Sequence, residues 1–173
     1  MQASLQAAGN YASPHPDPRG ARRAPSPRAR RRGYGTHPRA DKRAATKGDG
    51  WLTYYYTAES FARTWAKVRG YASEAGRDPD ALVATNQLPI CIGRRETIEA
   101  PMKHWLQTEW DYAAWSESTM DSAIIGSVEE CVEQLQAHIA TGVDRIIFVP
   151  YRYESEQLAL LAGEVIPRLN STA

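Results

Sequence analysis

The sequence has few cysteines, few phenylalanines and no long apolar run. Its two cysteines, Cys91 and Cys131, are too few and too far apart for a disulfide framework or a cysteine-rich zinc site. Both lie in apolar patterns, so we expect buried, reduced thiols and no metal. No segment approaches the ~18 consecutive apolar residues of a membrane span, and the N-terminus lacks the apolar core of a signal peptide. These absences predict a soluble, cytoplasmic protein.

The net charge of +1 is the sum of a basic N-terminal segment and an acidic remainder of the chain. Residues 1–32 contain seven Arg and one acidic residue, Asp17, whereas the rest of the chain has five more acidic than basic side chains. The same segment contains five Pro and no Val, Ile, Phe or Trp. It cannot bury enough apolar surface to offset the entropy lost on ordering, which predicts disorder.

Residues 1–32 are open to three interpretations. An arginine-rich arm could neutralise nucleic-acid phosphates, but no aromatic side chains are interleaved with the arginines, so we expect no nucleic-acid partner. A solvated basic tail is the simpler interpretation. The third is that the segment is not native coding sequence, and it depends on the resemblance described below.

From residue 38 onward the pattern becomes regular. Pro38 and Gly48 delimit a predicted short helix, and the aromatic run 51–56 predicts a strand. Thr57 is expected to cap a second helix, which Gly76 ends. Its buried stripe is predicted at Phe61, Trp65, Val68 and Ala72. A second strand is predicted through Ile92, with Pro89 marking a bulge or an edge position.

The second half of the chain continues the alternation of predicted helices and strands. Residues 95–121 hold three of the five Trp and predict one or two helices, followed by a short extended segment at 123–125. Ser127 and Glu130 form a capping-box pattern that opens another helix, whose exposed face we expect to carry His138. The last strand is predicted at 145–150, where a continuous apolar run follows Arg145, as in parallel sheets buried on both faces.

A final helix is predicted after that strand. Its inner face is expected to contain Leu158, Leu161, Val165 and Leu169. Strands that alternate with helices indicate the α/β class with a parallel sheet. The last helix–strand–helix unit has the size of one repeat of a barrel.

Several segments together resemble the luciferase-like monooxygenase family. They are GYGTHPRADKRAATKGDGWLT, AGRDPDAL, AIIGSVEECVEQLQAHIATGVDRIIFVPY and EQLALLAGEVIPRL. No single motif is decisive, and the specificity lies in their order and separation from Gly33 to about Asn170. The resemblance implies a TIM-type (β/α)8 barrel, of which residues 33–170 form only the C-terminal part. Residues 1–32 then stand where a barrel strand is expected, which suggests a frameshift or misplaced start.

The resemblance also implies a cofactor and a place for it. Members of the family use either FMN or the deazaflavin coenzyme F-420, and this sequence does not decide between them. Barrel enzymes act at the C-terminal ends of their strands. The loop Gly33, Tyr34, Gly35 and Thr36, with Arg39, is therefore expected to hold the phosphate end of the cofactor. The expected substrate pocket is formed by Trp51, Arg94, Tyr151 and Arg152.

The implied function is hydride transfer or oxygen activation on a small organic substrate, with oxygen insertion requiring a flavin. No nucleophile and base stand out, because the cofactor carries the chemistry in such enzymes. The Trp-rich segment 104–115 is either a cover over the substrate side or a satellite hydrophobic cluster. Two alternatives stay open: a truncated gene product without catalytic activity, and a non-enzymatic module with a basic nucleic-acid-binding arm. A barrel lacking half its strands has open edges, which makes a homodimer one expected form.

Overall fold

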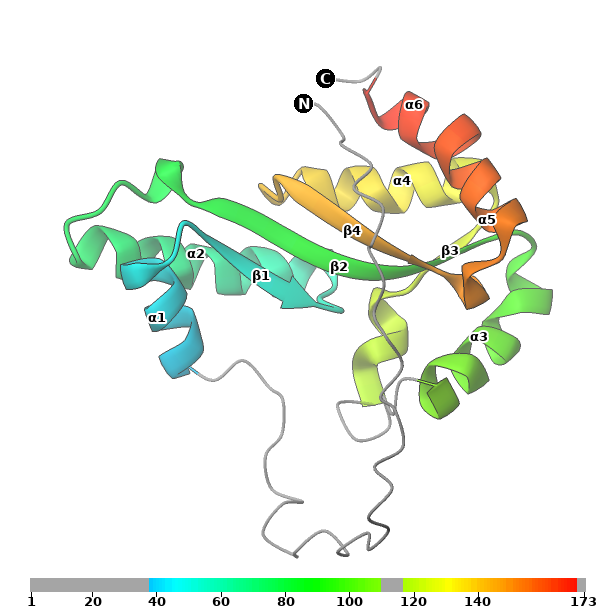
Figure 1. The fold of residues 1–173 in the computed structure, drawn as a ribbon, viewed down its shortest axis with the longest axis horizontal. Helices are drawn as coiled ribbons and strands as arrows, with labels where there is room; N and C mark the ends of the chain where they lie inside the picture. Colours follow the sequence, from blue (N-terminus) through cyan, green and yellow to red (C-terminus); the bar gives the residue numbers. More distant parts are fainter. Residues whose placement is uncertain (1–37, 110–116, 171–173) are drawn as a thin grey trace, which may run out of the picture.

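The computed structural model describes residues 38–109 and 117–170 (Figure 1). Four strands are present in these ranges: β1 (Gly50–Tyr54), β2 (Val83–Ile92), β3 (Ile124–Gly126) and β4 (Arg145–Pro150). The principal helices are α1 (Pro38–Lys47), α2 (Ala58–Glu74), α3 (Arg95–Glu109), α4 (Val128–Ile139), α5 (Ser155–Leu160) and α6 (Ile166–Asn170). A π-helical segment, η6 (Leu161–Val165), joins α5 to α6, and short 3-10 turns are η2 (Pro79–Ala81), η4 (Glu117–Ser122) and η5 (Tyr151–Tyr153).

The four strands form one parallel sheet with β2 at its centre. Residues 50–54 of β1 pair with 83–87 of β2, and β4 pairs with 85–90. Because these partners overlap on β2, β1 and β4 lie on opposite sides of it. The short strand β3 pairs with the last three residues of β2. The predicted α/β class with a parallel sheet is therefore confirmed.

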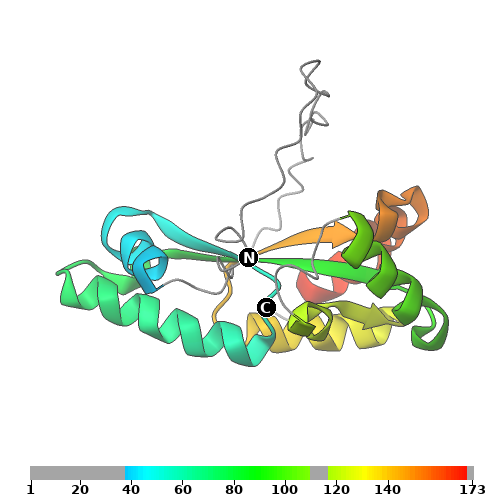
Figure 2. The same ribbon diagram turned by 90° about the horizontal axis from the view of Figure 1, so that it is seen from below.

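Helices α2 and α4 cover one face of the sheet, which we call the outer face (Figure 2). Beneath α2, the core contains Trp51, Phe61, Trp65, Val68, Ala72 and Ala84. Beneath α4, it contains Leu88, Ile90, Ile124, Cys131, Leu135, Leu161 and Val165. The predicted stripe of α2 is confirmed, and Thr57 and Ser127 cap α2 and α4 as predicted. The outer-face core therefore holds the sheet in place by ordinary apolar burial.

The opposite, inner face is covered only in part by the described residues. At the C-terminal ends of the strands, α3 and η4 bury a cluster that contains Cys91, Met102, Trp105, Leu106, Ile125 and Val149. Further down the strands, Leu52 and Tyr54 of β1 and Ile147 of β4 are 42–48% exposed. Tyr54 and Ile147 are both aligned with Gln87 of β2, so they lie on the same face. The inner face thus exposes large apolar side chains.

Pro89 was predicted to mark a bulge or an edge, but it lies within the central strand, where its register with β4 is continuous. The hydrogen bonds of Val83 N to Asp49 O and of Tyr55 N to Gln87 O show that odd-numbered β2 residues face β1. Pro89 therefore points its nitrogen toward that side, between the last β1 partner, Gln87, and the first β3 partner, Ile90. Proline has no N–H to donate to a neighbouring strand, and on this side of β2 no described strand pairs with residue 89.

Two helical expectations are wrong. His138 is 4% exposed, because it continues the stripe of Cys131 and Leu135 at helical spacing. Leu158 is 44% exposed, because Gln157 is the residue of α5 that faces β2. The amide of Gln157 accepts from Ile92 N at 2.7 Å and donates to Ile92 O at 2.9 Å.

Candidate functional site

The C-terminal ends of β1 and β4 carry unusual backbone conformations. Tyr55 (φ 58°), Arg152 (φ 50°) and Tyr153 (φ 55°) are the non-glycine residues with positive φ in the described ranges. Tyr55 directly follows β1, and Arg152 and Tyr153 lie in the turn η5 that follows β4. Left-handed conformations cost energy for residues with a Cβ and tend to cluster at functional sites. The strand ends are therefore the first place to look for a site.

Aromatic rings form a wall at these strand ends. Trp105 of α3 packs edge-on against Tyr151 at 5.4 Å and against Tyr153 at 6.1 Å between ring centroids. The guanidinium carbon of Arg152 lies 5.6 Å from the centroid of the Tyr151 ring, within range of a cation–π interaction. The phenol oxygen of Tyr55 accepts a hydrogen bond from Gln87 Nε2 at 3.2 Å. This aromatic wall offers flat apolar surfaces beside one exposed cation.

Loss of contact with water disfavours the charged forms of the two phenols and the thiol in this region. Burial raises the pKa of Tyr55 and of Tyr153 above the ordinary tyrosine value, and raises the pKa of the Cys91 thiol to about 11. A thiol with such a pKa is a poor nucleophile at neutral pH. The wall can therefore bind and orient a molecule, but Cys91, Tyr55 and Tyr153 do not supply an anionic nucleophile at neutral pH.

A second group of residues follows β2 and β3. A cleft of about 660 Å³ lies here, lined by two Arg and by four acidic side chains, Glu96, Glu129, Glu130 and Glu156. Arg94 is exposed, whereas Arg95 donates from Nη2 to the carbonyl oxygen of Ile125 at 2.5 Å. The cleft is therefore of mixed charge and is not a simple anion site.

The N-terminus of α4 in this cleft is already occupied by its own side chains. Ser127 N donates to Glu130 Oε2 at 2.7 Å, and Glu130 N donates to Ser127 Oγ at 3.3 Å. Gly126 (φ 147°) must be glycine, because a Cβ there would collide with the Glu130 side chain. The predicted capping box of Ser127 and Glu130 is thus confirmed.

The predicted site residues are found in different places. Gly33, Tyr34, Gly35 and Thr36 lie outside the described residues, and Arg39 is exposed in the first turn of α1. Tyr151 and Arg152 belong to the aromatic wall, and Arg94 belongs to the mixed-charge cleft.

Trp51 is placed apart from the other predicted pocket residues. It is 5% exposed, stacks on Trp65 at 6.0 Å, and donates from Nε1 to Asp41 Oδ1 at 3.2 Å. Its side chain lies on the outer face because residues alternate along β1. Trp51 therefore serves the core beneath α2.

Sequence reasoning included Tyr55 only as one of three tyrosines, 54–56, that could contribute a pocket wall, and it missed Tyr153. Tyr153 was not singled out, although it stands in a short aromatic run after the predicted strand 145–150. The signal available in the sequence was the position of these tyrosines at the end of a predicted strand. The left-handed backbone conformation of a tyrosine cannot be predicted from its residue type. The backbone conformation of the strand ends therefore had to come from the structure.

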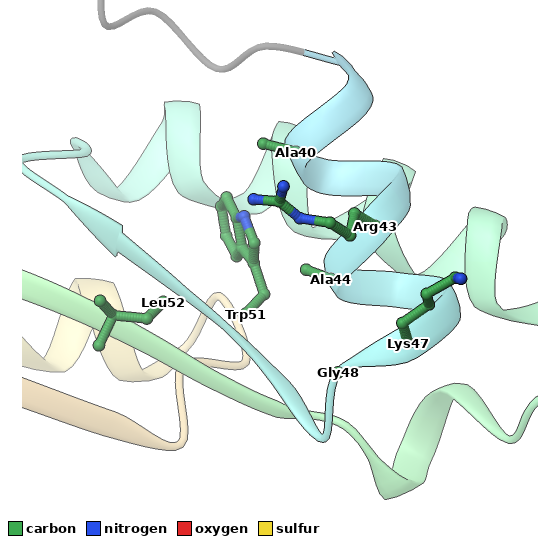
Figure 3. A pocket seen from close by; sticks show the side chains of 7 residues that line it. All are labelled: Ala40, Arg43, Ala44, Lys47, Gly48, Trp51 and Leu52. Carbon is green, nitrogen blue, oxygen red and sulfur yellow. The ribbon is translucent and has the colours of Figure 1, made fainter.

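A groove runs between α1 and β1. Its volume is about 430 Å³, and it is lined by Ala40, Arg43, Ala44, Lys47, Gly48, Trp51 and Leu52. Figure 3 shows α1 beside β1 on the side away from β2, with Arg43 and Trp51 both reaching into the space between them. On the side of α1 the groove is lined by two alanines, Ala40 and Ala44, and by two cations, Arg43 and Lys47.

The parallel sheet with helices on one face and strained strand ends has the character of part of a (β/α) barrel. A family model for luciferase-like monooxygenases matches residues 2–145, and the chain belongs to this family. The match includes residues 2–32, so a beginning of family sequence at Gly33 stays a prediction. A search of curated proteins finds no match.

Several solved structures share the fold, and the descriptions of some of them name F-420 or FMN. One is the coenzyme F-420 dependent tetrahydromethanopterin reductase from Methanopyrus kandleri, with 17% identity, a TM-score of 0.58, and coverage of 78% of this chain and 49% of that one. Another is an F-420-dependent secondary alcohol dehydrogenase in complex with an F-420–acetone adduct, with 15% identity, a TM-score of 0.61 and coverage of 76% and 46%.

A third is riboflavin lyase with modified FMN and riboflavin, with 13% identity, a TM-score of 0.60 and coverage of 80% and 42%. At these identities the likeness shows the fold alone. The chain spans less than half the length of these solved structures. In the ranges that the structure describes, no helix is both long and apolar enough to cross a membrane.

Proposed function

We propose that this chain provides the C-terminal half of the active site of a flavin- or deazaflavin-dependent oxidoreductase that acts on a small organic substrate. The observation that carries the proposal is the clustering of left-handed, non-glycine backbone at the ends of β1 and β4, beside an aromatic wall. Strain of this kind is retained where function requires it. Family membership and the solved relatives support a cofactor of the FMN or F-420 type.

The described residues fit one side of such a cofactor. Its ring system is planar and aromatic, which suits the faces of Tyr151 and Tyr153, and its phosphate is anionic, which suits exposed cations such as Arg152. When bound, the reduced cofactor supplies a hydride, or in the case of a flavin activates oxygen. The chain's own residues bind and orient the reactants and keep the tyrosines and Cys91 protonated.

The proposal is tested by titrating the purified 173-residue chain into FMN and, separately, into F-420 while following quenching of cofactor fluorescence. We expect saturable binding of one of them. Arg152→Ala should weaken this binding by about tenfold, because a hydrogen bond to a charged group contributes roughly 1.5–3 kcal/mol. The matched control is Arg63→Ala on the outer helix α2, where Arg63 pairs with exposed Glu59 at 3.0 Å.

The two variants separate a specific site from general loss of structure. Equal weakening by Arg152→Ala and Arg63→Ala would show that the strand ends are not the binding site. Failure of both cofactors to bind would favour the alternative that this polypeptide is a truncated gene product without catalytic activity. The alternative of a basic nucleic-acid-binding arm concerns residues 1–32, which lie outside the described residues.

A further inference from the structure

The chain leaves β1 with a break in the alternation of its side chains. Trp51 is buried on the outer face and Tyr54 is exposed on the inner face, as alternation along a strand requires. Continued alternation would carry Tyr55 to the outer face. Tyr55 has a φ of 58° instead, and its side chain packs against the inner-face cluster beneath α3. Two consecutive tyrosines therefore lie on one face of the sheet.

The aromatic rings at this break lie on different faces of the sheet. Those of Tyr54 and Tyr55 lie on the inner face, 6.1 Å apart between centroids and with their planes inclined at 36°. The ring of Tyr56 returns to the outer face, where it meets Trp51 edge-on at 5.6 Å. A single left-handed residue thus turns the end of an alternating strand into a pair of aromatic side chains on the side of the candidate site.

Two neighbouring residues of β2 hold this break in place. The backbone carbonyl oxygen of Gln87 accepts from Tyr55 N at 2.9 Å, and Gln87 Nε2 donates to the Tyr55 phenol oxygen at 3.2 Å. From the other face of the strand, Asn86 Nδ2 donates to Tyr56 O at 3.0 Å. A left-handed residue with a Cβ is unfavourable in isolation, so it persists only where its surroundings determine it. Hydrogen bonds to Tyr55 and to the residue after it provide that determination.

Asn86 is a polar residue in an apolar row. It is 0% exposed, and the preceding and following residues on its face of β2, Ala84 and Leu88, both belong to the outer-face core. Its Oδ1 has no hydrogen-bond partner among the described residues. A buried amide oxygen without a partner lowers stability, so packing alone would favour an apolar side chain here. What Asn86 provides in return is the hydrogen bond to Tyr56 O.

We propose that Asn86 is a positioning residue of the candidate site. Through Tyr56 O it holds Tyr55 in the left-handed conformation, and it thereby keeps the rings of Tyr54 and Tyr55 together on the inner face. Asn86 itself contacts no reactant, because its side chain lies on the opposite face of the sheet. The benefit to the site rests on the proposed function, since a planar cofactor or substrate stacks on aromatic rings that are held in one orientation.

The proposal is tested on the full chain by the fluorescence titrations with FMN and with F-420. Asn86→Leu fills a similar volume with an apolar group and removes the donor to Tyr56 O. We expect it to weaken binding of whichever cofactor binds by up to about tenfold. Leu88→Val, at the next outer-face position of β2, is the matched control, because it alters the same core but keeps the hydrogen bond of Asn86. It should leave the dissociation constant unchanged.

A double-mutant cycle separates positioning from a general loss of structure. Tyr55→Gly adopts the left-handed conformation without strain and lacks the ring. Because Asn86 acts through Tyr55, Asn86→Leu should weaken binding in the native background and cause no further weakening in the Tyr55→Gly background. Equal weakening in both backgrounds, or native affinity in Asn86→Leu, overturns the positioning role.

The conformation of Tyr55 is also measured without a ligand, so that this inference and the proposed function fail separately. In NMR spectra, the nuclear Overhauser effect between the Tyr55 ring and the Gln87 side-chain amide should be present in the native chain and in Leu88→Val, and lost in Asn86→Leu. Its persistence in Asn86→Leu overturns the inference, whereas a native chain that binds neither cofactor contradicts only the proposed function. Far-ultraviolet circular dichroism checks folding, and Asn86→Ala replaces Asn86→Leu if the latter does not fold.

Discussion

His138 shows how burial alone can make one side chain sensitive to pH. It is 4% exposed on α4, and its Nδ1 has no hydrogen-bond partner in the described part of the chain. Burial lowers the pKa of His138 to about 4 from the usual 6.5. The folded protein therefore holds a neutral imidazole where an unfolded chain would bind a proton.

The pH dependence that follows has a definite sign. Between pH 6.5 and about 4 the unfolded chain binds more protons at this residue than the folded chain, so stability falls as the pH falls. The contribution of neutral His138 to the free energy of unfolding is fully present above pH 6.5. As the pH falls to about 4 and below, the free energy of unfolding decreases through this residue by about 3 kcal/mol at most. His138→Leu should flatten this part of the stability profile, measured by urea unfolding at a series of pH values.

The control for this prediction is Ile139→Val, on the next position of the same helix. It removes a methylene from a partly buried side chain and has no group that titrates. It should lower stability by about 0.5–1.5 kcal/mol at every pH and leave the slope unchanged. An unaltered slope in His138→Leu would mean that other groups set the acid sensitivity.

At the scale of the elements, Gln157 ties the last helix to the centre of the sheet. Its amide bonds to both the N–H and the C=O of Ile92, 65 residues earlier in the chain. The side chain of Gln157 thus satisfies the backbone groups of Ile92 as a residue of a neighbouring strand would. We expect Gln157→Ala to lower the free energy of unfolding by about 2 kcal/mol, because two partly buried backbone groups lose their partner.

Thermal and urea unfolding measure this effect against Glu156→Ala. Glu156 is the adjacent, exposed residue of the same helix, so its replacement should change stability by no more than about 0.5 kcal/mol. Similar losses in the two variants would assign the effect to the propensity of α5 rather than to the link with Ile92.

The sequence predicts the elements well where the signal is local. Thr57, Ser127 and Glu130 cap their helices as expected, because a cap is a hydrogen bond between residues three apart. Pro89, His138 and Leu158 were misplaced because their environment comes from distant elements. Pro89 is tolerated only because of where β1 ends and β3 begins, and Leu158 is displaced by the contact of Gln157 with Ile92.

For the molecule as a whole, alternation of strands and helices was sufficient to predict the parallel sheet, and the quoted segments were sufficient to predict the family. The candidate site was predictable only in part. Tyr151 and Arg152 follow a strand in sequence, but the wall that they form with Trp105 depends on how α3 folds back over the inner face. Which strand edges stay open also depends on the full topology.

The open edge of β1 leads to a prediction that can be read residue by residue. In a single copy, the amides of Trp51 and Thr53 face β2 and should exchange slowly with solvent, whereas those of Leu52 and Tyr54 face outward and should exchange fast. Hydrogen exchange resolved by NMR at low and high protein concentration measures the protection of each amide.

Each pattern of exchange identifies what covers the edge. Protection of Leu52 and Tyr54 that appears only at high concentration means that another copy of the chain covers the β1 edge. Protection already present at high dilution means that a segment of the same chain pairs with β1. Fast exchange of both amides in a sample that is fully dimeric means that the copies meet elsewhere, because a parallel strand on this edge must accept hydrogen bonds from these two N–H groups.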